Sequence, residues 1–218
     1  MKTCLLSSGG GGNLKFFYLG KKMGILKNID VYLITDRECG ALYFAHKVGI
    51  YAKKITYKRT YNKELLEELE RLNPDIIIGS WHKIIDKEVV QKYYGRLINL
   101  HYSLLPAFGG LIGLEQIIGK AYEMNCQYIG CTCHFIDENV DSGKIIAQAI
   151  IKVDIPINEA IQKVFEKGCL ILLNSILIIT NDHSIIERTQ NDKFDYSPSL
   201  LFDDSLFDKE FWKQVAKL

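Results

Sequence analysis

Short apolar runs alternate with segments of helical periodicity along the first hundred residues, and few architectures accommodate that alternation. Residues 75–79 read Asp-Ile-Ile-Ile-Gly, a continuous apolar run typical of strands buried on both faces of a parallel sheet. We expect strands at residues 4–7, 31–34, 51–57, 75–79 and 96–100, and helices at residues 14–26, 41–48, 63–72 and 87–94. This order predicts an α/β fold with a doubly wound, mostly parallel, Rossmann-like sheet and helices on both faces.

The second half of the chain departs from this alternation. We expect a helix at 114–124, strands at 128–136 and 144–153 joined by a long acidic connection, and a long helix at 157–179. Gly168 is a candidate interruption of that long helix. We divide the chain into one domain at residues 1–180 and a C-terminal appendage at 181–218. Its amphipathic stretch at 208–218 predicts either packing on the domain or self-association as a homodimer.

Composition restricts the kinds of partner. The 218 residues carry 27 basic and 26 acidic side chains, a formal net charge of +1. We therefore expect small-molecule partners, with neither nucleic acid nor an anionic membrane among them. No segment reaches the roughly 18 to 20 consecutive apolar residues that span a bilayer. The start of the chain shows no signal-peptide pattern, so a cytoplasmic location is expected. The six cysteines form no Cys-x-x-Cys pair and are interpreted as free thiols, with no metal expected.

Four consecutive glycines lie between the first expected strand and the first expected helix. Glycine tolerates positive φ and lets backbone N–H groups approach an anion, and the helix start adds the positive end of its dipole. The loop therefore predicts a phosphate site formed by Gly9, Gly10, Gly11, Gly12 and Asn13. It matches neither G-x-G-x-x-G nor a P-loop, so no particular nucleotide is indicated. The alternative is a flexible strand-to-helix turn.

Asn99 and His101 lie two residues apart at the carboxyl end of an expected strand, so their side chains share one face. In open α/β sheets this end is where ligands bind. A histidine can move a proton or donate to a developing oxyanion, and an asparagine amide can add a neutral hydrogen bond to the same oxygen. The alternative is a capping asparagine and a surface histidine.

Asp141 lies in the acidic connection, within the sequence Asp-Ser-Gly. Asp and Gly in a loop are first of all turn residues. Asp137 and Glu138 compete with Asp141 for any acid role. The pattern alone therefore leaves the choice of carboxylate open.

A longer spaced pattern joins these segments. It reads Asn99-x-His101-x-Ser103-Leu104-Leu105-Pro106, then Gly130-x-Thr132-x-His134, then Asp141-x-Gly143-x-Ile145-Ile146-x-Gln148. This pattern resembles the signature of the formyltetrahydrofolate-dependent formyltransferases. The glycine loop, chain length and strand order are most similar to the glycinamide ribonucleotide transformylases of purine synthesis. The resemblance covers residues 1 to about 180 and leaves the tail outside it.

The resemblance implies transfer of a formyl group from N10-formyltetrahydrofolate, the co-substrate, to an amine, without a metal. It implies that Asn99 and His101 stabilise the oxyanion while Asp141 orients His101 or a water and assists proton transfer. Ser103 and His134 would support these three residues, and the glycine loop would hold the acceptor's phosphate. The implied folate site consists of Trp81, His82, Lys83, Ile84, Ile85, Val89, Asp137, Glu138 and Val140.

The chain departs from the purine enzymes mainly around the acceptor. Gly12 replaces a usual serine, residues 79–83 are bulkier, and the loop at 107–113 lacks the usual histidines and basic residue. In the purine enzymes, a glutamate holds the acceptor amine. An ungapped alignment places Gly168 at that position in this chain, and a two-residue shift of the alignment would place Glu166 there. Three alternatives stay open: an amino-sugar nucleotide N-formyltransferase, a formyltetrahydrofolate hydrolase, and a non-catalytic folate- or nucleotide-binding module. Hydrolases of this type carry an N-terminal regulatory domain, which this sequence does not show.

Overall fold

The computed structural model describes residues 1–110, 113–189 and 192–218, which form two compact units. The first contains Met1–Ile98, Asp182–Glu187 and Ser205–Leu218, and the second contains Asn99–Asn181 and Arg188–Asp204. The division falls within strand β5 (Leu97–His101), so the first half of this strand belongs to one unit and Asn99 and His101 to the other. The separation of a catalytic domain at 1–180 from an appendage stays a prediction.

The first unit is built on parallel strands, as the apolar runs predict. They are β1 (Lys2–Ser7), β2 (Asp30–Thr35), β3 (Ala52–Lys54), β4 (Ile76–Ser80) and the start of β5, in the order β3-β2-β1-β4-β5. Leu5 of β1 lies opposite Leu33 of β2 and Ile78 of β4, and all three are buried. Because strand order reverses on either side of β1, the carboxyl ends of β1 and β4 form a switch point of the kind that binds ligands.

Helices connect these strands. They are α1 (Gly12–Lys22), α2 (Gly40–Val48), α3 (Lys63–Leu72) and α4 (Lys87–Lys92), followed near the C-terminus by α7 (Lys209–Lys217). Helix α1 is shorter than the predicted 14–26, because Gly24 adopts a φ of +74° and the Leu26 N–H turns back to donate to the Gly20 carbonyl. Strand β3 is likewise shorter than the predicted 51–57, since only three residues pair with β2.

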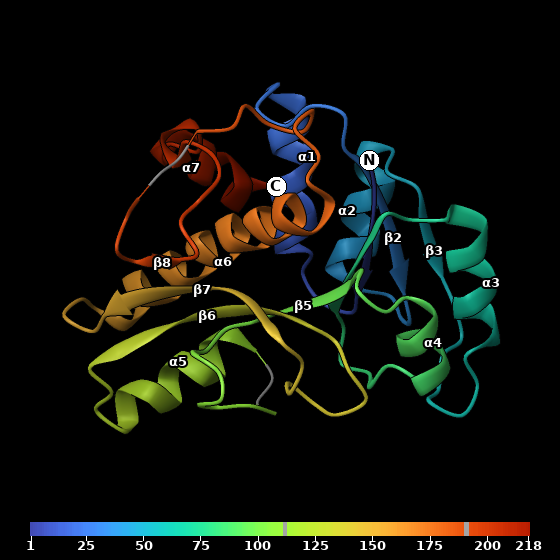
Figure 1. Cartoon of the computed structure of the whole chain (residues 1–218), viewed down its shortest axis with the longest axis horizontal. Helices are drawn as coiled ribbons and strands as arrows, with labels where there is room; N and C mark the ends of the chain where they lie inside the picture. Colours follow the sequence, from blue (N-terminus) through green and yellow to red (C-terminus); the bar gives the residue numbers. More distant parts are fainter. Residues whose placement is uncertain (111–112, 190–191) are drawn as a thin grey trace. The chain divides into compact units, whose positions relative to one another are not determined.

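The amphipathic end of the tail packs within the first unit. Trp212 of α7 stacks on Phe16 of α1, with ring centroids 5.6 Å apart and planes 9° from parallel, and Phe207 and Phe211 complete the cluster. Helices α1 and α7 can be followed side by side in Figure 1. Of the two uses predicted for residues 208–218, the structure thus shows packing on the chain itself.

The second unit contains an antiparallel hairpin with a long helix against it (Figure 1). The hairpin strands are β6 (Tyr128–Phe135) and β7 (Ile145–Lys152), β8 (Tyr196–Ser197) adds to β7, and the helices are α5 (Leu114–Glu123) and α6 (Ile157–Thr180). The chain passes from the second unit to the first within a short 3-10 turn, Asp204–Leu206. Helix α6 is continuous through Gly168, so the suggested interruption is absent.

The two units together confirm the α/β class with a mostly parallel sheet. In the described part of the chain, no helix is both long and apolar enough to cross a membrane.

Candidate active site

Strand β5 presents Asn99 and His101 on one face at its carboxyl end. Leu100 between them points the other way and is buried, which fixes the orientation of its neighbours. His101 is only 6% exposed, although a surface histidine was the alternative interpretation. The period-two geometry of the strand therefore places both predicted side chains together in the second unit.

The loop between β6 and β7 delivers Asp141. Gly143 approaches Phe135 so closely that a Cβ atom would lie 1.7 Å from the Phe135 carbonyl oxygen, so only glycine closes this turn. Asp137 accepts hydrogen bonds from the Ser142 hydroxyl at 2.7 Å and from the Asn139 N–H at 3.0 Å. Its Oδ1 is thereby engaged in holding the loop. Asp141, with a φ of +52°, is the loop carboxylate that contacts the histidines.

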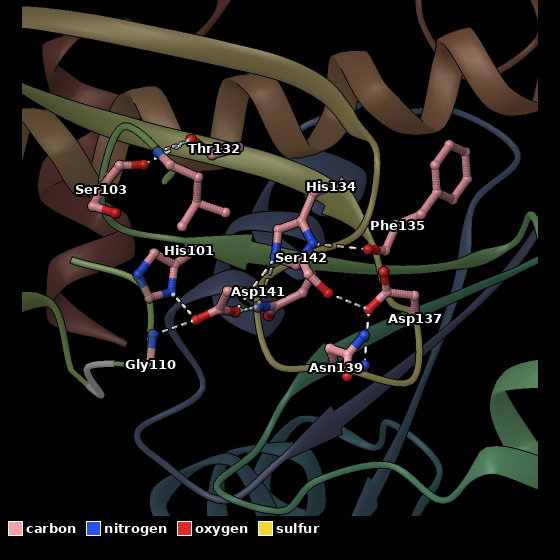
Figure 2. A network of polar contacts seen from close by, with 12 residues as sticks. His101, Ser103, Gly110, Thr132, His134, Phe135, Asp137, Asn139, Asp141 and Ser142 are labelled. Atoms are coloured by element: carbon pink, nitrogen blue, oxygen red, sulfur yellow. Dashed lines mark hydrogen bonds and ion pairs between the residues drawn. The ribbon is translucent and has the colours of Figure 1, made fainter. Parts of the chain in front are cut away.

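Asp141 lies between two imidazole rings (Figure 2). Its Oδ2 is 3.4 Å from His101 Nδ1 and accepts the Gly110 N–H at 2.8 Å. Its Oδ1 is 3.5 Å from His134 Nε2 and accepts from Asn99 Nδ2 at 3.4 Å. Burial opposes ionisation, but the hydrogen bonds from His134 and Gly110 and the charges of the two imidazoles outweigh it and lower the pKa of Asp141 to about 2. The carboxylate is therefore ionised at neutral pH.

His134 contacts both Asn99 and Asp141, whereas the sequence predicted only a supporting role for it. It is 2% exposed, and its Nδ1 donates to the Phe135 carbonyl at 2.8 Å, which turns Nε2 toward Asp141 and Asn99 Nδ2, the latter at 3.3 Å. The register of the hairpin shifts between Cys133 and His134. Such a bulge redirects a side chain. The motif Gly130-x-Thr132-x-His134 identified His134 as a candidate site residue but did not indicate these contacts.

Two motif residues near the site, Ser103 and Thr132, form hydrogen bonds within the chain. The Thr132 hydroxyl donates to the Ser103 carbonyl at 2.7 Å and accepts from the Leu105 N–H at 3.1 Å and from Gln148 Nε2 at 3.0 Å. The Ser103 hydroxyl donates to the Ala107 carbonyl. These bonds hold the first part of the loop after β5, residues 103–107. Residues 111 and 112 of this loop, part of the predicted departure at 107–113, lie outside the described residues.

The glycine loop of the first unit makes a close approach to the start of α2. Gly11 has a φ of +76°, and a Cβ there would lie 2.9 Å from Ala41. The Ala41 N–H donates to the Gly9 carbonyl at 2.9 Å. Among the described residues, no side chain forms a capping hydrogen bond at the N-terminus of α1. The loop thus leaves the helix start without a side-chain acceptor, a geometry that suits an anion.

The predicted folate residues are distributed over both units. In the first, Trp81 packs on Tyr57 with centroids 4.8 Å apart, Val89 is fully buried and Ile85 nearly so, and His82 and Ile84 are exposed. The indole Nε1 of Trp81 is buried and has no hydrogen-bond partner among the described residues. In the second unit, Glu138 and Val140 are exposed. Whether these residues share a folate site stays a prediction.

Helix α6 carries both positions considered for a contact with the acceptor amine, Gly168 and Glu166. A Cβ at Gly168 would lie 3.1 Å from Tyr102 Cε1 and 3.2 Å from Leu100 Cδ2, so a glutamate does not fit there without displacement. Glu166 is partly exposed, accepts from Gln162 Nε2 at 2.9 Å, and has a pKa raised by burial. The carboxylate available on this part of α6 is therefore Glu166.

We expect acid to remove part of the stability that Asp141 contributes. Its folded-state pKa lies below the ordinary 3.8, so the contribution is present above about pH 4 and is lost as the pH falls toward 2. Between pH 6 and pH 2.5, the unfolding free energy of wild type should fall by about 2 kcal/mol more than that of Asp141→Asn. Urea unfolding at both pH values measures this, and equal losses would contradict it.

Comparison with known proteins adds an independent finding. A sequence model of the formyl transferase family matches residues 1–169. The chloroplastic phosphoribosylglycinamide formyltransferase of Arabidopsis thaliana is 33% identical over 163 residues, which cover 70% of this chain and 55% of that protein. The phosphoribosylglycinamide formyltransferase of Bacillus subtilis is 30% identical over 160 residues, covering 70% and 80%.

A solved structure agrees with these relatives. Glycinamide ribonucleotide transformylase 1 from Geobacillus kaustophilus superposes with a TM-score of 0.70 at 26% identity, covering 81% of this chain and 96% of that one. The chain spans about half the length of the plant relatives that it matches.

Proposed function

The chain belongs to the formyl transferase family, and from this we propose that it transfers the formyl group of N10-formyltetrahydrofolate to an amine. The observation that carries the proposal is the ionised Asp141 carboxylate held between His101 and His134, beside Asn99, at the carboxyl end of β5. Such a cluster suits a reaction that develops an oxyanion and moves a proton.

In the proposed reaction, the acceptor amine attacks the formyl carbon and the carbonyl oxygen becomes an oxyanion. Asn99 and His101 donate hydrogen bonds to that oxygen. The attacking nitrogen then loses a proton, N10 of the folate gains one, and the bond between N10 and the formyl carbon breaks. Because its pKa is about 2, Asp141 acts as an ionised acceptor that holds the imidazole in place, rather than as the acid.

For the acceptor, we propose an amine that carries a phosphate, with glycinamide ribonucleotide first. The names of the relatives from Arabidopsis and Bacillus support this choice. The phosphate would bind Gly9–Asn13 at the start of α1, and Glu166 would hold the amine. An amino-sugar nucleotide is the second candidate, because the loop at 107–113 departs from the purine enzymes.

The proposal extends to the setting of the enzyme. We propose a cytoplasmic protein that acts on small molecules without a bound metal, and has neither nucleic acid nor a membrane as partner. The near balance of 27 basic and 26 acidic side chains supports the absence of a polyanionic partner. Light scattering would test the expected homodimer.

One experiment separates the candidate functions. The protein is incubated with formyltetrahydrofolate and glycinamide ribonucleotide, with a panel of amino-sugar nucleotides, or without amine, and release of tetrahydrofolate is followed. Release that needs glycinamide ribonucleotide supports the proposal. Release only with an amino sugar would replace the acceptor, and release without amine would indicate a hydrolase. Binding of the folate without any release would indicate a binding module.

Glu166→Gln is expected to raise the KM for the amine acceptor by about 10-fold or more, because a charge-assisted hydrogen bond to the amine is lost. The KM for the folate should change little. Steady-state kinetics with each substrate varied in turn measures the difference. Glu159→Gln, on the exposed first turn of the same helix, is the matched control. An unchanged acceptor KM in Glu166→Gln would exclude this role.

A further inference from the structure

Both ring nitrogens of His101 face oxygen atoms of the protein itself. Nε2 lies 3.0 Å from the Phe108 carbonyl oxygen, and because a carbonyl only accepts, Nε2 carries the proton and donates it. Nδ1 lies 3.4 Å from Asp141 Oδ2. An imidazole has no third nitrogen. In this arrangement His101 therefore has no nitrogen left for a substrate oxygen.

The Phe108 carbonyl that His101 Nε2 contacts is chemically similar to the reacting group of the expected substrate. A peptide carbonyl is an amide oxygen, and the formyl group on N10 of a folate is also an amide, with hydrogen in place of the carbon chain. We propose that the Phe108 carbonyl is an internal stand-in for the formyl oxygen, and that it must leave Nε2 before His101 can stabilise the oxyanion. This inference rests on the proposed function, and it locates the formyl oxygen at His101 Nε2.

The turn that carries this carbonyl is built so that it can be released. Phe108 has a φ of +56° and Gly110 a φ of +79°, both in the left-handed region. Glycine adopts this region freely, whereas a residue with a Cβ is disfavoured there by a factor of about five or more. We call the turn closed when the Phe108 carbonyl accepts from His101 Nε2. The closed turn is stabilised by hydrogen bonds from the Gly110 N–H to Asp141 Oδ2 at 2.8 Å and from the Ala107 N–H to the Leu104 carbonyl at 3.0 Å. Strain at Phe108 opposes these bonds.

Substitutions at the two left-handed residues, Phe108 and Gly110, are expected to shift the stability of the closed turn in opposite directions. Gly110→Ala adds a Cβ that meets no described residue within 4 Å, so it disfavours the closed turn through φ and keeps the N–H that binds Asp141. Phe108→Gly relieves the strain and favours the closed turn. Phe108→Ala is its matched control, because it also lacks the ring but keeps the Cβ.

Carbethoxylation by diethyl pyrocarbonate reports the closed contact directly, since the reagent needs a free imidazole nitrogen. Peptide mass mapping follows His101, and the exposed His46 on α2 serves as the internal reference. We expect His101 to react up to about fivefold faster in Gly110→Ala than in wild type, and up to about fivefold more slowly in Phe108→Gly than in Phe108→Ala. Equal rates in both comparisons, or the reverse order, would overturn the inference.

Kinetics gives a second measurement at the same positions. The kcat/KM for the formyl donor should follow the carbethoxylation order, highest in Gly110→Ala and lower in Phe108→Gly than in Phe108→Ala. The opposite order would show that the carbonyl assists the reaction, and would also overturn the inference. Carbethoxylation needs no substrate. Absence of formyl transfer in every form would therefore remove the proposed function alone, and transfer without the predicted order of labelling would remove only this inference.

Discussion

His101→Ala is expected to lower kcat/KM for formyl transfer at least about 100-fold. Strand β5 places the imidazole ring beside Asp141, and its loss removes the oxyanion stabilisation by this ring and a route for the proton. Release of tetrahydrofolate, measured with the acceptor that supports turnover, gives the ratio. The loss should be mainly in kcat, because the folate and phosphate contacts proposed elsewhere are unchanged.

His183→Ala is the matched control for this variant. His183 is exposed and belongs to the first unit, whereas His101 belongs to the second. The control should keep wild-type kinetics within about twofold, as expected for a surface substitution. If His101→Ala kept more than a tenth of wild-type activity, the role assigned to His101 in the reaction would have to be abandoned.

Asp141→Asn is expected to cost about 1,000-fold in kcat/KM. The amide is nearly isosteric and can still accept from the Gly110 N–H, so the loop geometry should survive. The negative charge between His101 and His134 is lost, however, and the amide NH2 group takes the position of Oδ1, which accepted from Asn99 and faced His134. A neutral partner no longer supports a protonated imidazole.

The pH profile tests the ionised state of Asp141, and a control variant with circular dichroism excludes simple damage to the fold. Because the pKa of Asp141 is about 2, wild-type activity should show no ionisation of this group between pH 5 and pH 8. Asp154→Asn, an exposed surface change, should leave kcat/KM and unfolding unchanged. A wild-type rate in Asp141→Asn, confirmed to be folded by circular dichroism, would exclude the carboxylate from the reaction.

Most of the secondary structure could be predicted from the sequence, because burial and periodicity are local properties. Helix α3 begins and ends where its pattern does, at Lys63 and Leu72. The errors occur where a contact with residues outside the local pattern determines where a helix or strand ends. Leu26 follows the helical spacing, yet it turns back over Gly20, and only part of residues 51–57 pairs with β2.

The candidate site was predicted only in part. The resemblance indicated Asn99, His101 and Asp141, and the strand pattern placed the first two on one face. The sequence could not show that Asp137 holds its own loop, that His134 faces Asp141 at a shift of strand register, or that a side chain at position 168 would meet Tyr102 and Leu100. These contacts depend on strand register and on close approach at Gly143 and Gly168, which no local pattern reports.

The sequence by itself determined the α/β class, the family and the residue types of the site, because these follow from periodicity and from a spaced motif. Only the tertiary structure decided which atoms meet. The hairpin brought His134 and Asp141 within hydrogen-bonding range of Asn99, which lies 35 and 42 positions away in the sequence, and the loop after β5 placed the Phe108 carbonyl on His101. Hydrogen bonds depend on angstroms and directions, and those are set by the packing of the whole chain.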